Sequence, residues 1–147
     1  MHELDGLPCL VVRRQAAGGE GVHFLDPLAL VPIRQPLFIT GFVGDMIIAA
    51  GRWLAVFFLQ EGGDILPRVA LWDLRTRVEE SVAHWFECKG DVYYPFVTKE
   101  AEDAFEVMFV LRLFDSSHNR WLCRFRYPSG IVEELEKYSD LRLLPVA

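Results

Sequence analysis

The stretch that most constrains the fold is Gly44–Val82, which reads as three or four short strands separated by turns. Its centre is Val69–Thr76, an apolar strand that ends in Trp72-Asp73 and runs into a polar turn. Asp is favoured there because its side chain can accept hydrogen bonds from backbone N–H groups of the turn. The pattern predicts a unit of short antiparallel strands.

Weaker copies of this unit occur elsewhere in the chain. Val22–Leu28 aligns with Val69–Arg75, 47 residues further on, because both are apolar strands with an Asp that opens a turn. A third copy, Leu122–Tyr127 with the turn Pro128-Ser129-Gly130, follows roughly 50 residues later. A period of about 40–50 residues is typical of propeller blades, each a four-stranded antiparallel sheet. The predicted repeat units, within a single domain 1–147, are residues 8–36, 44–86 and 91–138.

At Val69–Thr76 the chain resembles the WD-repeat-like β-propellers, in particular the degenerate blades of F-box-type substrate receptors. The resemblance extends over residues 8–138 and implies that Leu25 and Trp72 pack between adjacent blades. The chain departs from these families in having neither a Gly-His pair before the blades nor F-box helices. Closed propellers typically use four to eight blades. Three units therefore imply a propeller fragment, an open β-array or one part of an assembly.

A free-standing β-sandwich or small barrel with one or two short helices is the alternative fold, and it is also mainly β and antiparallel. The aromatic content of 13% favours strands under both alternatives. Two hairpins are predicted, one around Gly51-Arg52 and one around residues 115–119. Arg77–Cys88 is ambiguous, because Thr76 and Glu79 have the spacing of a helix capping box while the same stretch also fits a blade's outer strand.

The charge disfavours nucleic acid as a partner. There are 15 Lys and Arg against 21 Asp and Glu, a formal net charge of −6, whereas nucleic-acid-binding proteins normally carry a basic excess or stripe. The basic cluster Arg120, Arg124 and Arg126, with Arg112 upstream, reads as the outward face of one strand.

Cysteine usage and hydropathy indicate a soluble, intracellular protein of the cytoplasm or nucleus. Cys9, Cys88 and Cys123 are widely spaced and odd in number, so they predict no disulfide framework. No secretory signal is visible at the N-terminus. Apolar runs are interrupted long before the roughly 20 residues of a membrane helix, so no membrane contact is predicted.

The C-terminal stretch Trp121–Pro145 resembles the end of a Tudor- or Agenet-type small barrel, with an aromatic strand, a Gly turn, an acidic stretch and a Leu-rich strand. The resemblance implies a chromatin reader that binds methylated lysine in an aromatic cage. Trp121, Phe125 and Tyr127 are the candidate cage residues, although three aromatics on one strand face are more often core.

Enzymatic chemistry has weak support in the sequence. His84 and Cys88 are four residues apart, which on a helix would place them on one face as metal ligands or as a thiolate–imidazole pair. These two residues define the alternative function of a small metal-dependent or Cys/His hydrolase. The remaining His and Cys are scattered, so neither a metal site nor a cofactor is predicted.

The function predicted from the sequence is a non-enzymatic protein–protein interaction module that acts by surface recognition. A protein partner or self-association is expected, because an open sheet exposes unpaired edges. Aromatic and arginine side chains commonly dominate such contacts. The candidate partner-binding residues are Trp53, Trp72, Arg75, Trp85, Trp121, Arg124 and Arg126.

Overall fold

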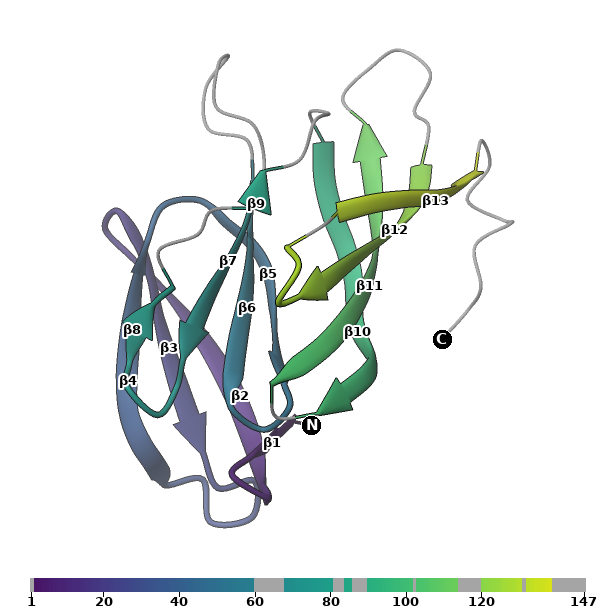
Figure 1. Cartoon of the computed structure of the whole chain (residues 1–147). Coiled ribbons are helices and arrows are strands. Elements are labelled where there is room, and N and C mark those ends of the chain that lie inside the picture. The colour runs from purple at the N-terminus through teal and green to yellow at the C-terminus, as the bar shows by residue number, and fades with distance from the viewer. Residues whose placement is uncertain are drawn as a thin grey trace.

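The structure, a computed structural model, describes residues 2–59, 68–80, 84–85, 90–101, 103–113, 120–130 and 132–138. Within these ranges the chain forms antiparallel strands in three sheets, which Figure 1 shows in chain order from one side of the molecule to the other. The predicted mainly-β, antiparallel fold class is confirmed. No helix occurs in the described residues, so this part of the chain also offers no apolar helix long enough to cross a membrane.

Each sheet is an up-and-down arrangement in which successive strands pair with one another, except that β9 pairs with β7. The first sheet contains β1 (His2–Leu4), β2 (Leu7–Ala16), β3 (Gly19–Leu25) and β4 (Pro32–Thr40). The second contains β5 (Val43–Ala49), β6 (Trp53–Phe58), β7 (Arg68–Asp73) and β8 (Val78–Glu79), and β9 (His84–Trp85) also pairs with β7. The third contains β10 (Gly90–Ala101), β11 (Ala104–Leu113), β12 (Arg120–Tyr127) and β13 (Val132–Tyr138).

The ambiguous stretch 77–88 forms strands where the structure describes it. Val78 pairs with Asp73, and His84 pairs with Val69, which places β8 and β9 beside β7. Arg77 has a φ of 65°, a left-handed conformation that an α-helix does not use. The capping-box spacing of Thr76 and Glu79 therefore belongs to a turn between two strands.

The segments aligned as an internal repeat occupy equivalent places in their sheets. Val22–Leu28 covers the end of β3 and Val69–Arg75 covers most of β7, and each is the third strand of its sheet. Leu122–Tyr127 lies on β12, the third strand of the third sheet. An Asp side chain also holds the turn after β3 and the turn after β7. Asp26 accepts the backbone N–H groups of residues 28 and 29, and Asp73 accepts that of residue 75.

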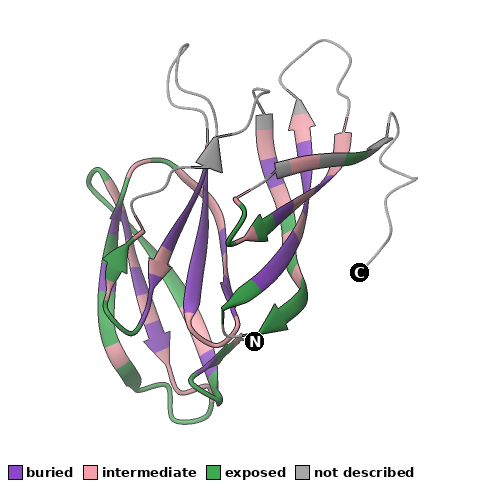
Figure 2. Cartoon of the chain, viewed as in Figure 1, coloured by how far each residue is buried: buried purple, intermediate pink, exposed green. Residues whose placement is uncertain are grey.

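The three sheets pack face to face, with the second sheet in the middle. One apolar core lies between the first and second sheets, and a second core lies between the second and third sheets. All six residues of β6 are buried. Side chains alternate along a strand, so Trp53, Ala55 and Phe57 pack towards the third sheet while those of residues 54, 56 and 58 pack towards the first. Figure 2 shows this burial along β6 and β7.

Truncating Phe57 to Ala is expected to destabilise the protein by about 3–5 kcal/mol, because Phe57 is fully buried and its ring lies 5.0 Å from that of Phe109 on the third sheet. Urea unfolding followed by tryptophan fluorescence measures the change. Phe96→Ala is the matched control: Phe96 is 48% exposed, so its loss is expected to cost less than about 1 kcal/mol. Equal effects of the two substitutions would contradict a core between the second and third sheets.

Candidate functional site

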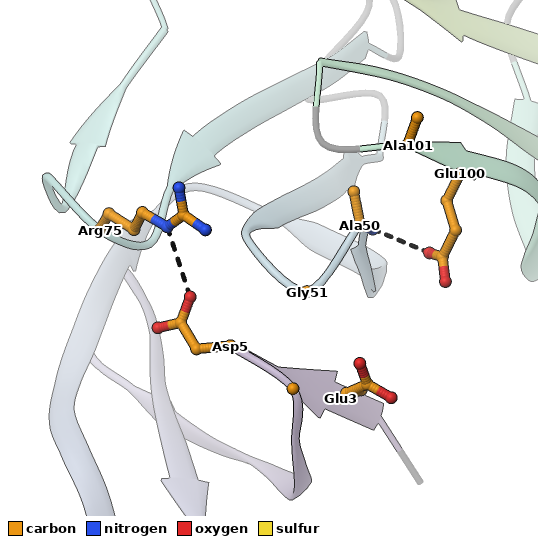
Figure 3. A pocket seen from close by; sticks show the side chains of 8 residues that line it. Glu3, Asp5, Ala50, Gly51, Arg75, Glu100 and Ala101 are labelled. Atoms are coloured by element: carbon orange, nitrogen blue, oxygen red, sulfur yellow. Dashed lines mark hydrogen bonds and ion pairs between the residues drawn. The ribbon is translucent and has the colours of Figure 1, made fainter.

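A pocket of about 450 Å³ lies where strand ends and turns of all three sheets meet (Figure 3). The first sheet contributes β1 and the turn that follows it, the second sheet contributes the β5–β6 and β7–β8 turns, and the third sheet contributes the end of β10. The pocket is lined by Glu3, Asp5, Gly6, Ala50, Gly51, Arg75, Glu100 and Ala101.

Two tight turns shape the pocket. Asp5 and Gly6 have φ values of 51° and 79°, and Ala50 and Gly51 have values of 53° and 60°. Positive φ at both central residues is the type I′ conformation, which matches the twist of antiparallel strands. Each turn therefore closes its hairpin tightly and lies next to the neighbouring sheet.

Hydrogen bonds between sheets hold these turns in place. The Asp5 N–H donates to the Gly51 carbonyl at 2.8 Å and ties the first sheet to the second. The Ala50 N–H donates to the Glu100 carboxylate at 2.8 Å and ties the second sheet to the third. The pocket walls are consequently fixed relative to one another before any ligand arrives.

The charges of the pocket fall into two halves. On one side of the Gly51 turn, the Asp5 carboxylate forms ion pairs with Arg75, at 3.3 Å, and with Arg34. On the other side Figure 3 shows Glu3 and Glu100. Both of these side chains are exposed, and among the described residues neither has a cation as partner. Within the described part of the chain, this half of the pocket therefore carries a negative charge that no cation balances.

Asp73 fixes the turn that carries Arg75. Its carboxylate accepts two hydrogen bonds from Arg52, at 2.7 and 3.1 Å, and a third from the Arg75 N–H at 3.0 Å. The Leu74 N–H in turn donates to the Arg52 carbonyl at 2.9 Å. The hydrogen bond from Arg52 holds the pKa of Asp73 below its usual value, against the opposing effect of burial.

The tryptophans that the sequence predicts as partner-binding residues pack mainly inside the molecule. Trp53 lies in the core, with its ring 4.9 Å from that of Tyr127 and the Arg52 guanidinium 4.9 Å above it. Trp72 and Trp121 are partly buried against the two cores. Trp53 thus offers no free surface to a partner. Trp85 lies in β9, but its side chain is outside the described part of the structure.

The arginines that the sequence predicts as partner-binding residues lie in two separate places. Arg75 lines the pocket, whereas Arg124 and Arg126 lie on the third sheet beside the buried Glu106. Burial alone would raise the pKa of Glu106, but the hydrogen bonds from Thr98 and Arg126 outweigh it and leave the pKa lowered. Arg124 also forms an ion pair with Glu133. These two arginines therefore balance charge within their own sheet.

The candidate cage residues of the Tudor-like alternative do not open into the pocket. Phe125 is fully buried, and Tyr127 stacks on Phe105 with a ring distance of 5.1 Å and packs against Trp53. Of the hydrolase residues, Cys88 and the side chain of His84 lie outside the described structure. In the described part, no group of three or more His, Cys, Asp or Glu residues is placed to hold a metal ion.

Sequence reasoning did not find most of the pocket residues. Arg75 was predicted, but Glu3, Asp5 and Glu100 were not. The Asp5-Gly6 dipeptide is a recognisable turn signal, so a tight turn could have been predicted there. Nothing in the local sequence indicates that Glu100 meets this turn, because they are joined only through the packing of the sheets.

Comparison of the chain with known protein families, with curated proteins and with solved structures gives no match. The function is therefore inferred from the geometry and chemistry of the chain itself.

Replacing Asp73 with Asn is expected to destabilise the protein at neutral pH by about 2 kcal/mol, because it removes the charge that Arg52 pairs with in a largely buried setting. The pKa of Asp73 is lowered in the folded state, so its ionised form stabilises the fold above the usual value of 3.8. That contribution is lost as pH falls through the lowered pKa. The difference between wild type and variant should therefore stay constant from about pH 7 to about pH 5 and shrink from about pH 4 to about pH 2.

Urea unfolding across this pH range measures the difference. Asp103→Asn is the control, because Asp103 is exposed in the turn after β10 and its replacement should change stability by less than about 0.5 kcal/mol throughout. A difference for Asp73→Asn that stays constant down to about pH 2 would show that the ion pair does not support the turn.

Proposed function

We propose that this protein is a non-enzymatic interaction module that recognises a protein partner at the pocket where its three sheets meet. The pocket itself carries the proposal: it is held by hydrogen bonds between sheets, and its Glu3 and Glu100 side is negative. Such a site suits a lysine or arginine side chain of an exposed segment of the partner.

The arrangement of the sheets supports this proposal. We infer that the sheets are blade-like units of a propeller-type architecture, as the resemblance at Val69–Thr76 implied. Three successive antiparallel meanders with equivalent third strands, of which the second also includes β9, are consistent with that inference, as are the Asp-held turns after β3 and β7. Loops and strand ends on one side of a stack are well suited to binding, because the packed sheets hold them rigidly.

The chemistry of the pocket favours recognition of a cation. The Ala50 N–H engages one oxygen of Glu100, which leaves the other oxygen able to accept a hydrogen bond from a ligand. Glu3 is a second acceptor within the same pocket. Arg75, which is paired with Asp5, makes its own side of the pocket less favourable for a cation. A bound cation is therefore expected on the side of Glu3 and Glu100. We infer that the partner's basic side chain lies between Glu3 and Glu100.

A short fluorescent peptide rich in lysine and arginine is expected to bind the protein, whereas an acidic peptide of the same length is not. The double substitution Glu3→Gln and Glu100→Gln should weaken binding roughly fivefold, because each exposed charge pair contributes about 0.2–1 kcal/mol. Arg75→Gln should change affinity in the opposite direction, since it removes the positive charge of the pocket. Fluorescence anisotropy measures all three affinities.

The matched control is Glu79→Gln with Asp103→Asn, which removes the same total charge at exposed positions outside the pocket. If this control weakens binding as much as the pocket variant does, the peptide senses only net charge. If neither peptide binds the wild type, the pocket is not a site for basic segments.

A further inference from the structure

The two outward faces of the three-layer stack differ in character. The inner faces of the first and third sheets are covered by the second sheet, and their outer faces point away from it. In the described part of the chain, most of the exposed large apolar side chains belong to the first sheet and its connections, namely Leu7, Val12, Leu28, Leu30, Val31, Ile33, Phe38 and Phe42. Among the described residues, apolar surface therefore remains in water mainly on the first sheet.

The outer face of the first sheet is mainly apolar, although His23 and Arg14 also lie on it. Cys9, Val22 and Ile39 point into the core, so the residues that alternate with them point outward. Register places Leu10 beside Leu25, Val12 beside His23, and Phe38 beside Gly21. A Cβ built on Gly21 would lie 3.5 Å from the His23 ring, which shows that this ring lies on the outer face too.

Exposure and charge distinguish this surface from an ordinary sheet exterior. Phe38 is 55% exposed and Val12 is 38% exposed, on neighbouring parts of one face. Arg14 is the ionised side chain of this face, at one end of β2, and no carboxylate alternates with the core residues of β2, β3 and β4. Antiparallel sheets that face water normally carry polar side chains there.

The apolar surface continues beyond the strands into the connection from β3 to β4. Leu28 is 95% exposed and Leu30 is 60% exposed, yet this connection is held by four hydrogen bonds that involve Asp26. Figure 2 shows the connection as an exposed projection at the lower end of the molecule. A fixed loop that displays leucines loses little conformational entropy when it is covered.

The outer face of the third sheet, by contrast, carries ion pairs at both ends. Arg112 lies 3.5 Å from Asp91 at one end. Arg126 and Arg124 pair with the buried Glu106 at the other end. Between them, Tyr93, Val110 and Leu122 are neighbours on successive strands.

We propose that a second copy of this chain covers the outer face of the first sheet, so that the two first sheets pack face to face around a twofold axis. An apolar face with one cationic end is complementary to itself when the copies run in opposite directions, because the two Arg14 side chains then lie at opposite ends of the contact. A twofold interface also uses the same surface on both copies, so the assembly ends at a dimer.

The alternative, in which the first sheet of one copy packs on the third sheet of the next, is disfavoured by charge. That contact would take Arg112, Arg124 and Arg126 out of water against a surface that offers no carboxylate in return. Burying charged groups without new partners is unfavourable. The self-complementary contact buries no acidic group of the first-sheet face.

The size of the face indicates a weak dimer. Strands of 7 to 10 residues, at about 3.3 Å per residue and about 4.8 Å between strands, give a flat face of roughly 400 Å² per copy for β2, β3 and β4, and the connection to β4 adds to it. Two copies would together bury roughly 800 Å² plus the connections, less than the roughly 1,200 Å² of stable specific interfaces, so the monomer–dimer equilibrium should be visible on dilution. The contact is separate from the pocket, so either proposal can fail alone.

Sedimentation velocity over about 2–200 µM protein tests the proposal. The wild type should pass from monomer to dimer with rising concentration, and Phe38→Arg and Val12→Arg should each weaken the dimer at least about tenfold. Phe96→Arg is the matched control, an equally exposed apolar residue on the third sheet, and should leave dimerisation unchanged. Circular dichroism shows whether each variant is folded.

A wild type that stays monomeric at the highest concentration would overturn the proposal. So would a dimer that survives Phe38→Arg and Val12→Arg together. A wild type that grows beyond the dimer, or a Phe96→Arg variant that dissociates as Phe38→Arg does, would show that the first sheet contacts the third sheet of another copy instead.

Discussion

The burial of the second sheet on both faces is the constraint on which the rest of the structure depends. An antiparallel sheet commonly keeps one face in water, and its strands then alternate between apolar and polar residues. β6 cannot do so, because successive residues face different cores, and its sequence is accordingly apolar throughout. Each outer sheet has an apolar inner face only because the second sheet is there to cover it. Loss of packing at β6 would therefore affect all three sheets at once.

The position of the pocket follows from this stacking. Because the sheets lie face to face, their first strands come together along one side, and β5 contacts both β1 and β10. The turns at Asp5-Gly6 and Ala50-Gly51 then meet the end of β10, and hydrogen bonds join them in series from the first sheet to the third. The acidic pair Glu3 and Glu100 comes from the first and third sheets, so the site exists only when all the layers are assembled.

Local signals in the sequence were sufficient for the strands and several turns, but not for the site. The hairpin around Gly51-Arg52 is β5–β6, and the aligned stretches ending near Asp26 and Asp73 are third strands of their sheets, because alternation and turn chemistry act over a few residues. The helical spacing in 77–88 was misleading, since pairing with β7 overrides a local preference.

Trp53 was expected at a surface because large aromatics suit interfaces, yet the same apolar ring suits a core equally well. Glu3 and Glu100 meet only through tertiary packing, which no pattern within either segment encodes.

The outer sheets solve the problem of an uncovered face in different ways. The third sheet places Arg and Glu side chains opposite one another on neighbouring strands, so charge pairing satisfies these parts of its outer face. The first sheet has Val12 and Phe38 on its outer face, and these apolar side chains are exposed to water. The pocket opens at strand ends, whereas the apolar surface is a sheet face, so a basic partner segment and a second copy would occupy different surfaces.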